Sequence, residues 1–106
     1  MNIQFKKGVL ELCVLSMLAA SDRYGYDLAS NLSKSIDISD GTIYPILRRL
    51  KDEGYVTTYL QEASGGPPRK YYALTETGIR EQKKLEQEWN EFVVCVNAVL
   101  KEGVCS

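Results

Sequence analysis

The sequence predicts a mainly α-helical protein with one small β-hairpin and a long C-terminal helix. Apolar residues recur at helical spacing in several separate segments of the 106-residue chain. A dense Gly-Pro cluster separates two short runs that are rich in aromatic and β-branched residues, as in a hairpin. The apolar residues of the last segment follow steps of four and three, which is typical of a helix that pairs with another helix.

The length and composition indicate a single globular unit, with 44% hydrophobic and 25% charged residues. The formal net charge is −1, whereas many nucleic-acid-binding domains are basic overall, so only the local distribution of charge can argue for such a partner. No apolar run is long enough to span a bilayer, and no signal-type segment follows Met1. We therefore expect a cytoplasmic protein without a membrane partner.

The cysteines Cys13, Cys95 and Cys105 are odd in number and far apart, and the chain contains no histidine. The usual zinc-binding spacings are absent, so the sequence predicts no metal site and no cofactor. We expect free thiols in a reducing compartment, with Cys13 and Cys95 on apolar helix faces. The alternative is a redox role for Cys105 near the C-terminus.

The first two helices are predicted from residues 6–35. The segment KKGVLELCVLSMLAA is apolar on nearly all sides, which indicates a helix buried on several faces. The polar and glycine residues of SDRYGY then interrupt this pattern. In YDLASNLSKS, Leu28 and Leu32 lie one turn apart, which predicts a short second helix.

The segment SDGTIYPILRRLKDEGYV predicts the third helix, which ends before a C′ glycine at Gly54. Ser39 and Thr42 are the alternative N-caps. With Ser39 as the cap, Pro45 falls in the second turn and its ring must displace the Gly41 carbonyl. With Thr42 as the cap, the proline falls in the first turn and costs little. The apolar stripe of this helix is Ile43, Ile46, Leu47 and Leu50.

A β-hairpin and a fourth helix complete the chain. The runs YVTTYLQ and RKYYAL are the two strands, and EASGGPP is the loop between them. Tyr71 and Tyr72 alternate in direction, so one should enter the core and the other should point outward. The last helix should begin near Thr75, and its apolar positions have coiled-coil-like spacing.

Three helices followed by a hairpin form the pattern of a winged helix-turn-helix unit, which we place in residues 1–75, and residues 76–106 form a C-terminal dimerisation helix. The segments YGYDL, GTIYPILRRLKDEGYV and GGPPRKYYALTETG resemble the PadR family of bacterial transcriptional regulators in their order and separations. The tail EWNEFVVCVNAVL is similar to the single dimerisation helix of the short members. The resemblance implies a homodimer that binds a palindromic operator in double-stranded DNA and usually represses nearby genes. In some members a small aromatic or hydrophobic effector releases the DNA.

The exposed side of the third helix carries residue types that are unusual for such a face. A recognition helix enters the major groove by its N-terminal end, where a glycine keeps the first turn narrow. Hydroxyls and arginines there can reach base edges, and flanking cations suit phosphates. The alternative is a solvated face that carries two arginines. The residues expected to bind DNA are Gly41, Thr42, Tyr44, Pro45, Arg48, Arg49 and Lys51 of this helix, Arg69 and Lys70 of the wing, and Tyr24.

The last helix carries more apolar side chains than a domain of this size can bury. It should therefore pair with a second helix, and a two-fold partner is the simplest choice, with the first helix as the other half of the interface. In family members that bind flat aromatic compounds, a tryptophan at the place that Trp89 occupies lines a pocket at the dimer centre. The alternative is that Trp89 packs into the dimer core. The expected dimerisation residues are Leu85, Trp89, Phe92, Val93, Val96, Val99 and Leu100.

Two other classes of function compete with a DNA-binding regulator. An enzyme is not expected, because the chain lacks histidine, a GxSxG motif and a phosphate-cradling glycine loop, and Cys13 has no base beside it. A winged-helix protein–protein interaction module without DNA binding is the second alternative. A continuous patch of helix and wing cations favours DNA, whereas acidic residues that interrupt the patch favour the module. The cations are Arg48, Arg49, Lys51, Arg69 and Lys70, and the acidic residues are Asp40, Asp52 and Glu62.

Overall fold

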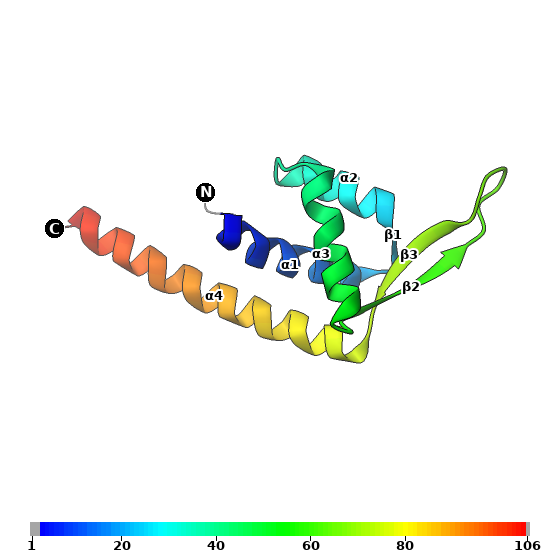
Figure 1. Cartoon of the computed structure of the whole chain (residues 1–106). Coiled ribbons are helices and arrows are strands. Elements are labelled where there is room, and N and C mark those ends of the chain that lie inside the picture. Colours follow the sequence, from blue (N-terminus) through cyan, green and yellow to red (C-terminus); the bar gives the residue numbers. More distant parts are fainter. Residues whose placement is uncertain (1–2, 106) are drawn as a thin grey trace.

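The computed structural model describes the backbone of residues 3–105 and the side chains of residues 8–102. In chain order the elements are α1 (Ile3–Ala20), β1 (Arg23–Tyr24), α2 (Gly25–Ser35), α3 (Asp40–Asp52), β2 (Val56–Gln61), β3 (Arg69–Leu74) and α4 (Glu76–Cys105). The β2–β3 hairpin and the end of α4 extend in opposite directions from a body formed by α1, α2 and α3 (Figure 1), so the molecule is 63 Å long. This order confirms the predicted winged helix-turn-helix with a long C-terminal helix.

The hydrophobic core lies between α1, α2, α3 and one face of the sheet. All four apolar residues of the predicted α3 stripe are buried, because their spacing places them on a single side of the helix. Tyr72 enters the core and is 8% exposed, whereas Tyr71 lies on the other face of the sheet, as the alternation predicts. The remaining core residues are Leu10, Val14, Leu15, Leu18, Leu28, Ala29, Leu32 and Val56.

The start of α3 decides between the two alternative N-caps, and its end contains the predicted glycine. Ser39 is the N-cap, and its hydroxyl lies 3.1 Å from the Thr42 hydroxyl instead of bonding the helix backbone. Pro45 therefore lies inside the helix, where it supplies no N–H for the Gly41 carbonyl. At the other end, Gly54 has a φ of +83°, which confirms the predicted C′ glycine.

The sheet contains a third strand that the sequence pattern did not predict. β1 pairs antiparallel with β3 through Arg23 opposite Tyr72 and Tyr24 opposite Tyr71, so the strand order is β1-β3-β2. Two residues are too few to show alternation, and the pairing depends on tertiary contact instead. Gly25 permits this contact, because a Cβ at this position would lie 2.8 Å from the Tyr72 ring.

α4 begins directly after Thr75, as expected. The Thr75 hydroxyl accepts a hydrogen bond from the Gly78 N–H (3.0 Å) and donates one to the Gly54 carbonyl (2.7 Å), which joins the α4 start to the end of α3. Farther along, Gln82 is buried and donates to the Ser16 hydroxyl of α1 at 3.2 Å. The first turns of α4 are thus packed against α1, and the rest of the helix projects away (Figure 1). Within the described part of the chain, no helix combines the length and apolarity needed to cross a membrane.

Candidate nucleic-acid interface

The outward face of α3 lies opposite its buried stripe and exposes Tyr44, Arg48 and Lys51. Gly41 precedes these residues in the first turn of the helix. Its φ is not positive, and a Cβ at this position would meet only the Ser39 hydroxyl, at 3.8 Å. Neither the backbone nor the packing of the chain therefore requires a glycine at position 41.

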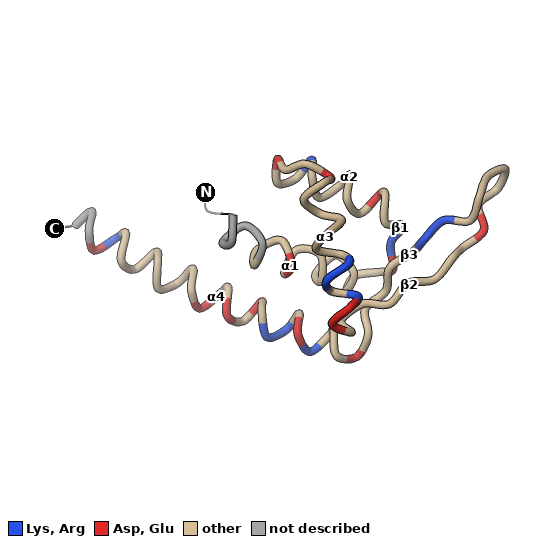
Figure 2. Tube along the Cα trace, viewed as in Figure 1, with Lys and Arg blue, Asp and Glu red and all other residues tan. Residues whose placement is uncertain are grey.

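A groove of about 520 Å³ separates this face of α3 from the inner face of the hairpin. Two separate elements contribute cations to it, and the tube coloured by charge shows basic positions on both α3 and the start of β3 (Figure 2). Three cations line the groove together with one carboxylate, so positive charge predominates. The lining residues are Tyr44, Arg48, Lys51, Asp52, Lys70 and Tyr72.

The two phenols in the groove stay protonated at neutral pH. Burial raises the pKa of Tyr72, and the nearby charge of Arg48 opposes this effect only in part. The pKa of Tyr44 is also raised, first by burial and then by the Asp40 carboxylate. Both hydroxyls are therefore neutral groups that can donate as well as accept a hydrogen bond.

The wing cations Arg69 and Lys70 lie on opposite faces of the hairpin. In the strand register Lys70 pairs with Leu60, and its ammonium lies 5.7 Å from the ring centre of Tyr72, inside the groove. The Arg69 guanidinium carbon lies 4.9 Å from the ring centre of Tyr24, on the outer face. The two predicted wing contacts and Tyr24 are thus divided between two surfaces.

The other flank of α3 faces α1. Here Thr42, Pro45 and Arg49 line a smaller pocket of about 310 Å³ with Glu11 and Ile46. Arg49 forms ion pairs with the Glu11 carboxylate of α1 and, at 3.0 Å, with the Glu53 carboxylate. The five cations of the helix and wing therefore do not form one continuous patch. Three lie in the groove, one lies on the outer face, and one is paired with carboxylates.

The sequence interpretation did not assign Tyr72 to the interface, although a signal for it exists. Lys70 and Tyr72 are two residues apart on a strand, so they point to the same side of the sheet. The Arg49–Glu11 pair had no such signal, because Glu11 lies 38 positions earlier and only the packing of α1 on α3 brings it near. Sequence reasoning therefore placed the helices and the hairpin, but it missed β1 and could not separate the two flanks of α3.

Five of the seven predicted dimerisation residues form an exposed apolar surface on the projecting part of α4, namely Trp89, Phe92, Val96, Val99 and Leu100. Trp89 is 36% exposed, Phe92 52% and Val99 66%, while Leu85 packs against the core. The C-terminal half of α4 carries few charges (Figure 2). Cys95 is exposed on α4, three residues from Phe92 and four from Val99, and Cys13 is half-buried. The side chain of Cys105 lies outside the described residues.

Comparisons with known proteins identify the family to which this fold belongs. The family model described as "Transcriptional regulator PadR-like family" matches residues 14–84. The chain is 37% identical to a PadR-like transcriptional regulator from Bacillus cereus, with a TM-score of 0.82 over 92% of this chain and 96% of that structure. A Streptococcus transcriptional regulator is similar, with 34% identity and a TM-score of 0.84 over 92% of this chain and 98% of that one.

Two curated relatives are longer proteins. The transcriptional regulator YqjI of Escherichia coli is 34% identical over 93% of this chain, which spans 50% of YqjI. The negative transcriptional regulator PadR of Bacillus subtilis is 30% identical over 69% of this chain and 42% of its own length. These relatives are regulators of transcription and not enzymes. With the family model, the shared fold and these identities, the chain belongs to the PadR-like family of transcriptional regulators.

Proposed function

We propose that the protein is a homodimer that binds a palindromic operator in double-stranded DNA and represses nearby genes. The observation that carries this proposal is the groove in which Arg48 and Lys51 of α3 lie near Lys70 of β3. Cations gathered from two elements on one surface match the negative charge of a duplex backbone. Among the described residues that line the groove, three cations outnumber one carboxylate, Asp52, and this excess of positive charge supports DNA as the ligand. Asp52 itself, and the separation of Arg49 and Arg69 from the groove, are the features that a protein-interaction module would share.

In this proposal α3 is the recognition helix. Gly41 lets a duplex approach the first turn of α3 closely, because the packing of the described residues does not require a glycine at this position. Thr42 and Tyr44 donate hydrogen bonds to base edges or phosphates, and Arg48 reads guanine or binds phosphate. Pro45 leaves the Gly41 carbonyl without its helical N–H donor, and Lys51 contacts the DNA backbone.

The hairpin is the wing. Its tip at residues 64–68 is exposed and contains only serine, glycine and proline, so it can lie along a minor groove without steric conflict. Lys70 contacts a phosphate of the DNA strand that α3 also contacts. Arg69, which lies beside Tyr24, binds a second phosphate. Arg49 contributes least, because Glu11 and Glu53 already compensate its charge.

Dimerisation occurs through the apolar surface of α4 and through α1. A projecting helix with exposed Trp89, Phe92 and Val99 gains stability when a second copy covers this surface. A two-fold axis through the interface gives the two α3 helices the symmetry of a palindromic operator.

We assign Trp89 as a candidate effector site. It is the single tryptophan of the chain, and a two-fold axis near α4 brings the two indoles together, where a planar aromatic compound can stack between them. The alternative is that Trp89 is packed entirely into the dimer core. Titration with a planar dye, followed by tryptophan fluorescence, distinguishes the two, because only the open arrangement gives saturable quenching at one dye per dimer.

The main test is binding to a duplex of the gene's own upstream region across a salt series, with a scrambled duplex as the control. We expect tight, sequence-selective binding of one dimer per site, with an affinity that falls steeply as salt rises. Equal affinity for both duplexes, or no binding at low salt, contradicts an operator-binding function and favours the protein-interaction module.

A further inference from the structure

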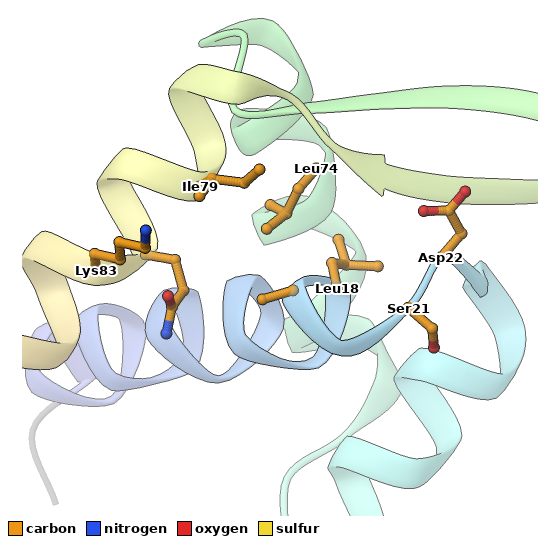
Figure 3. Close-up of a pocket in the computed structure, with 8 residues that line it drawn as sticks. Leu18, Ser21, Asp22, Leu74, Ile79 and Lys83 are labelled. Carbon is orange, nitrogen blue, oxygen red and sulfur yellow. The ribbon is translucent and has the colours of Figure 1, made fainter.

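Asp22 and Tyr59 join the two opposite edges of the sheet. The Tyr59 hydroxyl of β2 donates a hydrogen bond of 2.8 Å to Asp22 Oδ2, in the segment between α1 and β1. β3 lies between β1 and β2, so this bond crosses the central strand. Figure 3 shows Asp22 at the edge of the pocket between α1, β3 and α4, near the strands.

A row of three tyrosine rings lies on the same outer face. Tyr59 stacks on Tyr71 with ring centres 5.6 Å apart, and Tyr71 stacks on Tyr24 at 6.0 Å. The register places Tyr71 directly opposite both of the others. Each ring thus belongs to a different strand, and the row connects all three strands. The hydrogen bond to Asp22 raises the pKa of Tyr59, so the hydroxyl keeps its proton at neutral pH.

The wing needs such a connection because most of it extends beyond the third strand. β1 reaches only Tyr71 and Tyr72, and from Lys70 outward the hairpin is two-stranded. Leu60, opposite Lys70, is 70% exposed, so the core supports this part of the wing little. A two-stranded ribbon is only marginally stable by itself. The direction in which Arg69 and Lys70 point is therefore set at the base of the hairpin.

We propose that Asp22 and Tyr59 are positioning residues for DNA binding, which hold the wing at the angle where its cations and α3 meet one duplex together. Neither residue touches DNA in this role. Their bond and the tyrosine row fix the sheet before DNA arrives, so the wing loses little conformational freedom on binding. This inference rests on the proposed function.

The test compares Tyr59→Phe and Asp22→Ala with the intact protein on a duplex selected from a random pool. We expect each change to weaken specific binding roughly 3- to 10-fold, the range for one hydrogen bond, and the double variant to lose no more than either single variant. Asp22→Asn is the matched control: it removes the same charge as Asp22→Ala but keeps an acceptor, and should recover most of the affinity. Tyr71→Phe is the second control, because its hydroxyl has no partner among the described side chains.

Two further readouts separate positioning from a general loss of structure. In the Tyr59→Phe protein, Lys70→Ala should cost less affinity than it does in the intact protein, because the wing no longer reaches the duplex well. Hydrogen exchange of the hairpin amides should accelerate while exchange in α1 and α3 stays unchanged.

The outcomes distinguish this inference from the proposed function. If the intact protein selects no duplex, the proposed function fails, and the positioning role fails with it whatever the exchange rates show. If the intact protein binds but Tyr59→Phe binds equally well, or the double variant shows the product of the single losses, the inference alone is overturned. Faster exchange with unchanged affinity also overturns it.

Discussion

Lys70 and Arg69 are neighbours in the sequence, yet they lie against different aromatic rings on opposite faces of the wing. The Lys70 ammonium lies 5.7 Å from the Tyr72 ring in the groove, and the Arg69 guanidinium carbon lies 4.9 Å from the Tyr24 ring outside it. Strand alternation produces this division. A duplex held in the groove therefore meets these two cations from different directions, and they should contribute differently to binding.

Lys70→Ala should weaken specific and non-specific DNA binding by similar factors. A lysine in the groove supplies one phosphate contact, so its loss should reduce the slope of log affinity against log salt by about one. Salt-series titrations of the variant and the intact protein measure this slope. An unchanged slope with reduced affinity would show that Lys70 supports the fold of the wing rather than a phosphate contact.

Arg48→Ala should weaken operator binding more than binding to an unrelated duplex. Arg48 lies on the exposed face of α3 within the groove, where a guanidinium can make two hydrogen bonds to a guanine edge. Loss of such a contact costs roughly 1–3 kcal/mol and relaxes specificity at one base pair. The measurement is a competition titration with single-base operator variants. Equal loss on all duplexes would exclude Arg48 from base reading.

Gly41→Ala and Gly78→Ala should have opposite effects. A Cβ at Gly78 would lie 2.0 Å from the Tyr55 carbonyl oxygen, so the variant should lose about 3 kcal/mol of unfolding free energy. A Cβ at Gly41 meets nothing closer than 3.8 Å, so this variant should gain up to about 1 kcal/mol from helix propensity. Urea unfolding at fixed protein concentration measures both.

Gly41→Ala should nevertheless weaken operator binding several-fold, because the added methyl group faces the duplex. An affinity equal to that of the intact protein would mean that the first turn of α3 does not approach DNA closely.

Trp89→Ala should shift the protein toward monomer. Trp89 is partly exposed on the projecting part of α4, and truncation of a central interface tryptophan typically costs 2 kcal/mol or more of association. Sedimentation velocity across a concentration series detects the shift, with thermal unfolding as the control for folding. An identical sedimentation profile would count against a role of this residue in the dimer.

Cys13 should react slowly with iodoacetamide near pH 8. Burial raises the pKa of its thiol, so the reactive thiolate is a smaller fraction than in a free cysteine. The variant Cys95→Ser/Cys105→Ser isolates this thiol, and mass spectrometry follows its labelling before and after denaturation in urea. Rapid labelling of the folded variant would contradict the burial of Cys13.

The sequence by itself determined the order and type of the four helices and of the hairpin. Local patterns carry this information: the apolar stripe of α3 has helical spacing, Gly54 supplies a left-handed C′ residue, and Thr75 precedes the first turn of α4. The alternation of Tyr71 and Tyr72 similarly indicated that one ring enters the core. Each of these features depends on residues a few positions apart.

Tertiary structure alone decided which cations share a surface. Arg49 and Lys51 are two positions apart on one helix, yet packing of α1 gives Arg49 the Glu11 carboxylate, while Lys51 faces the groove with Lys70. The short strand β1 and the bond between Asp22 and Tyr59 are of the same kind. In each case the interacting residues lie tens of positions apart in the sequence. The local sequence pattern cannot predict such a contact, because it forms only when the folded core brings the distant segments together.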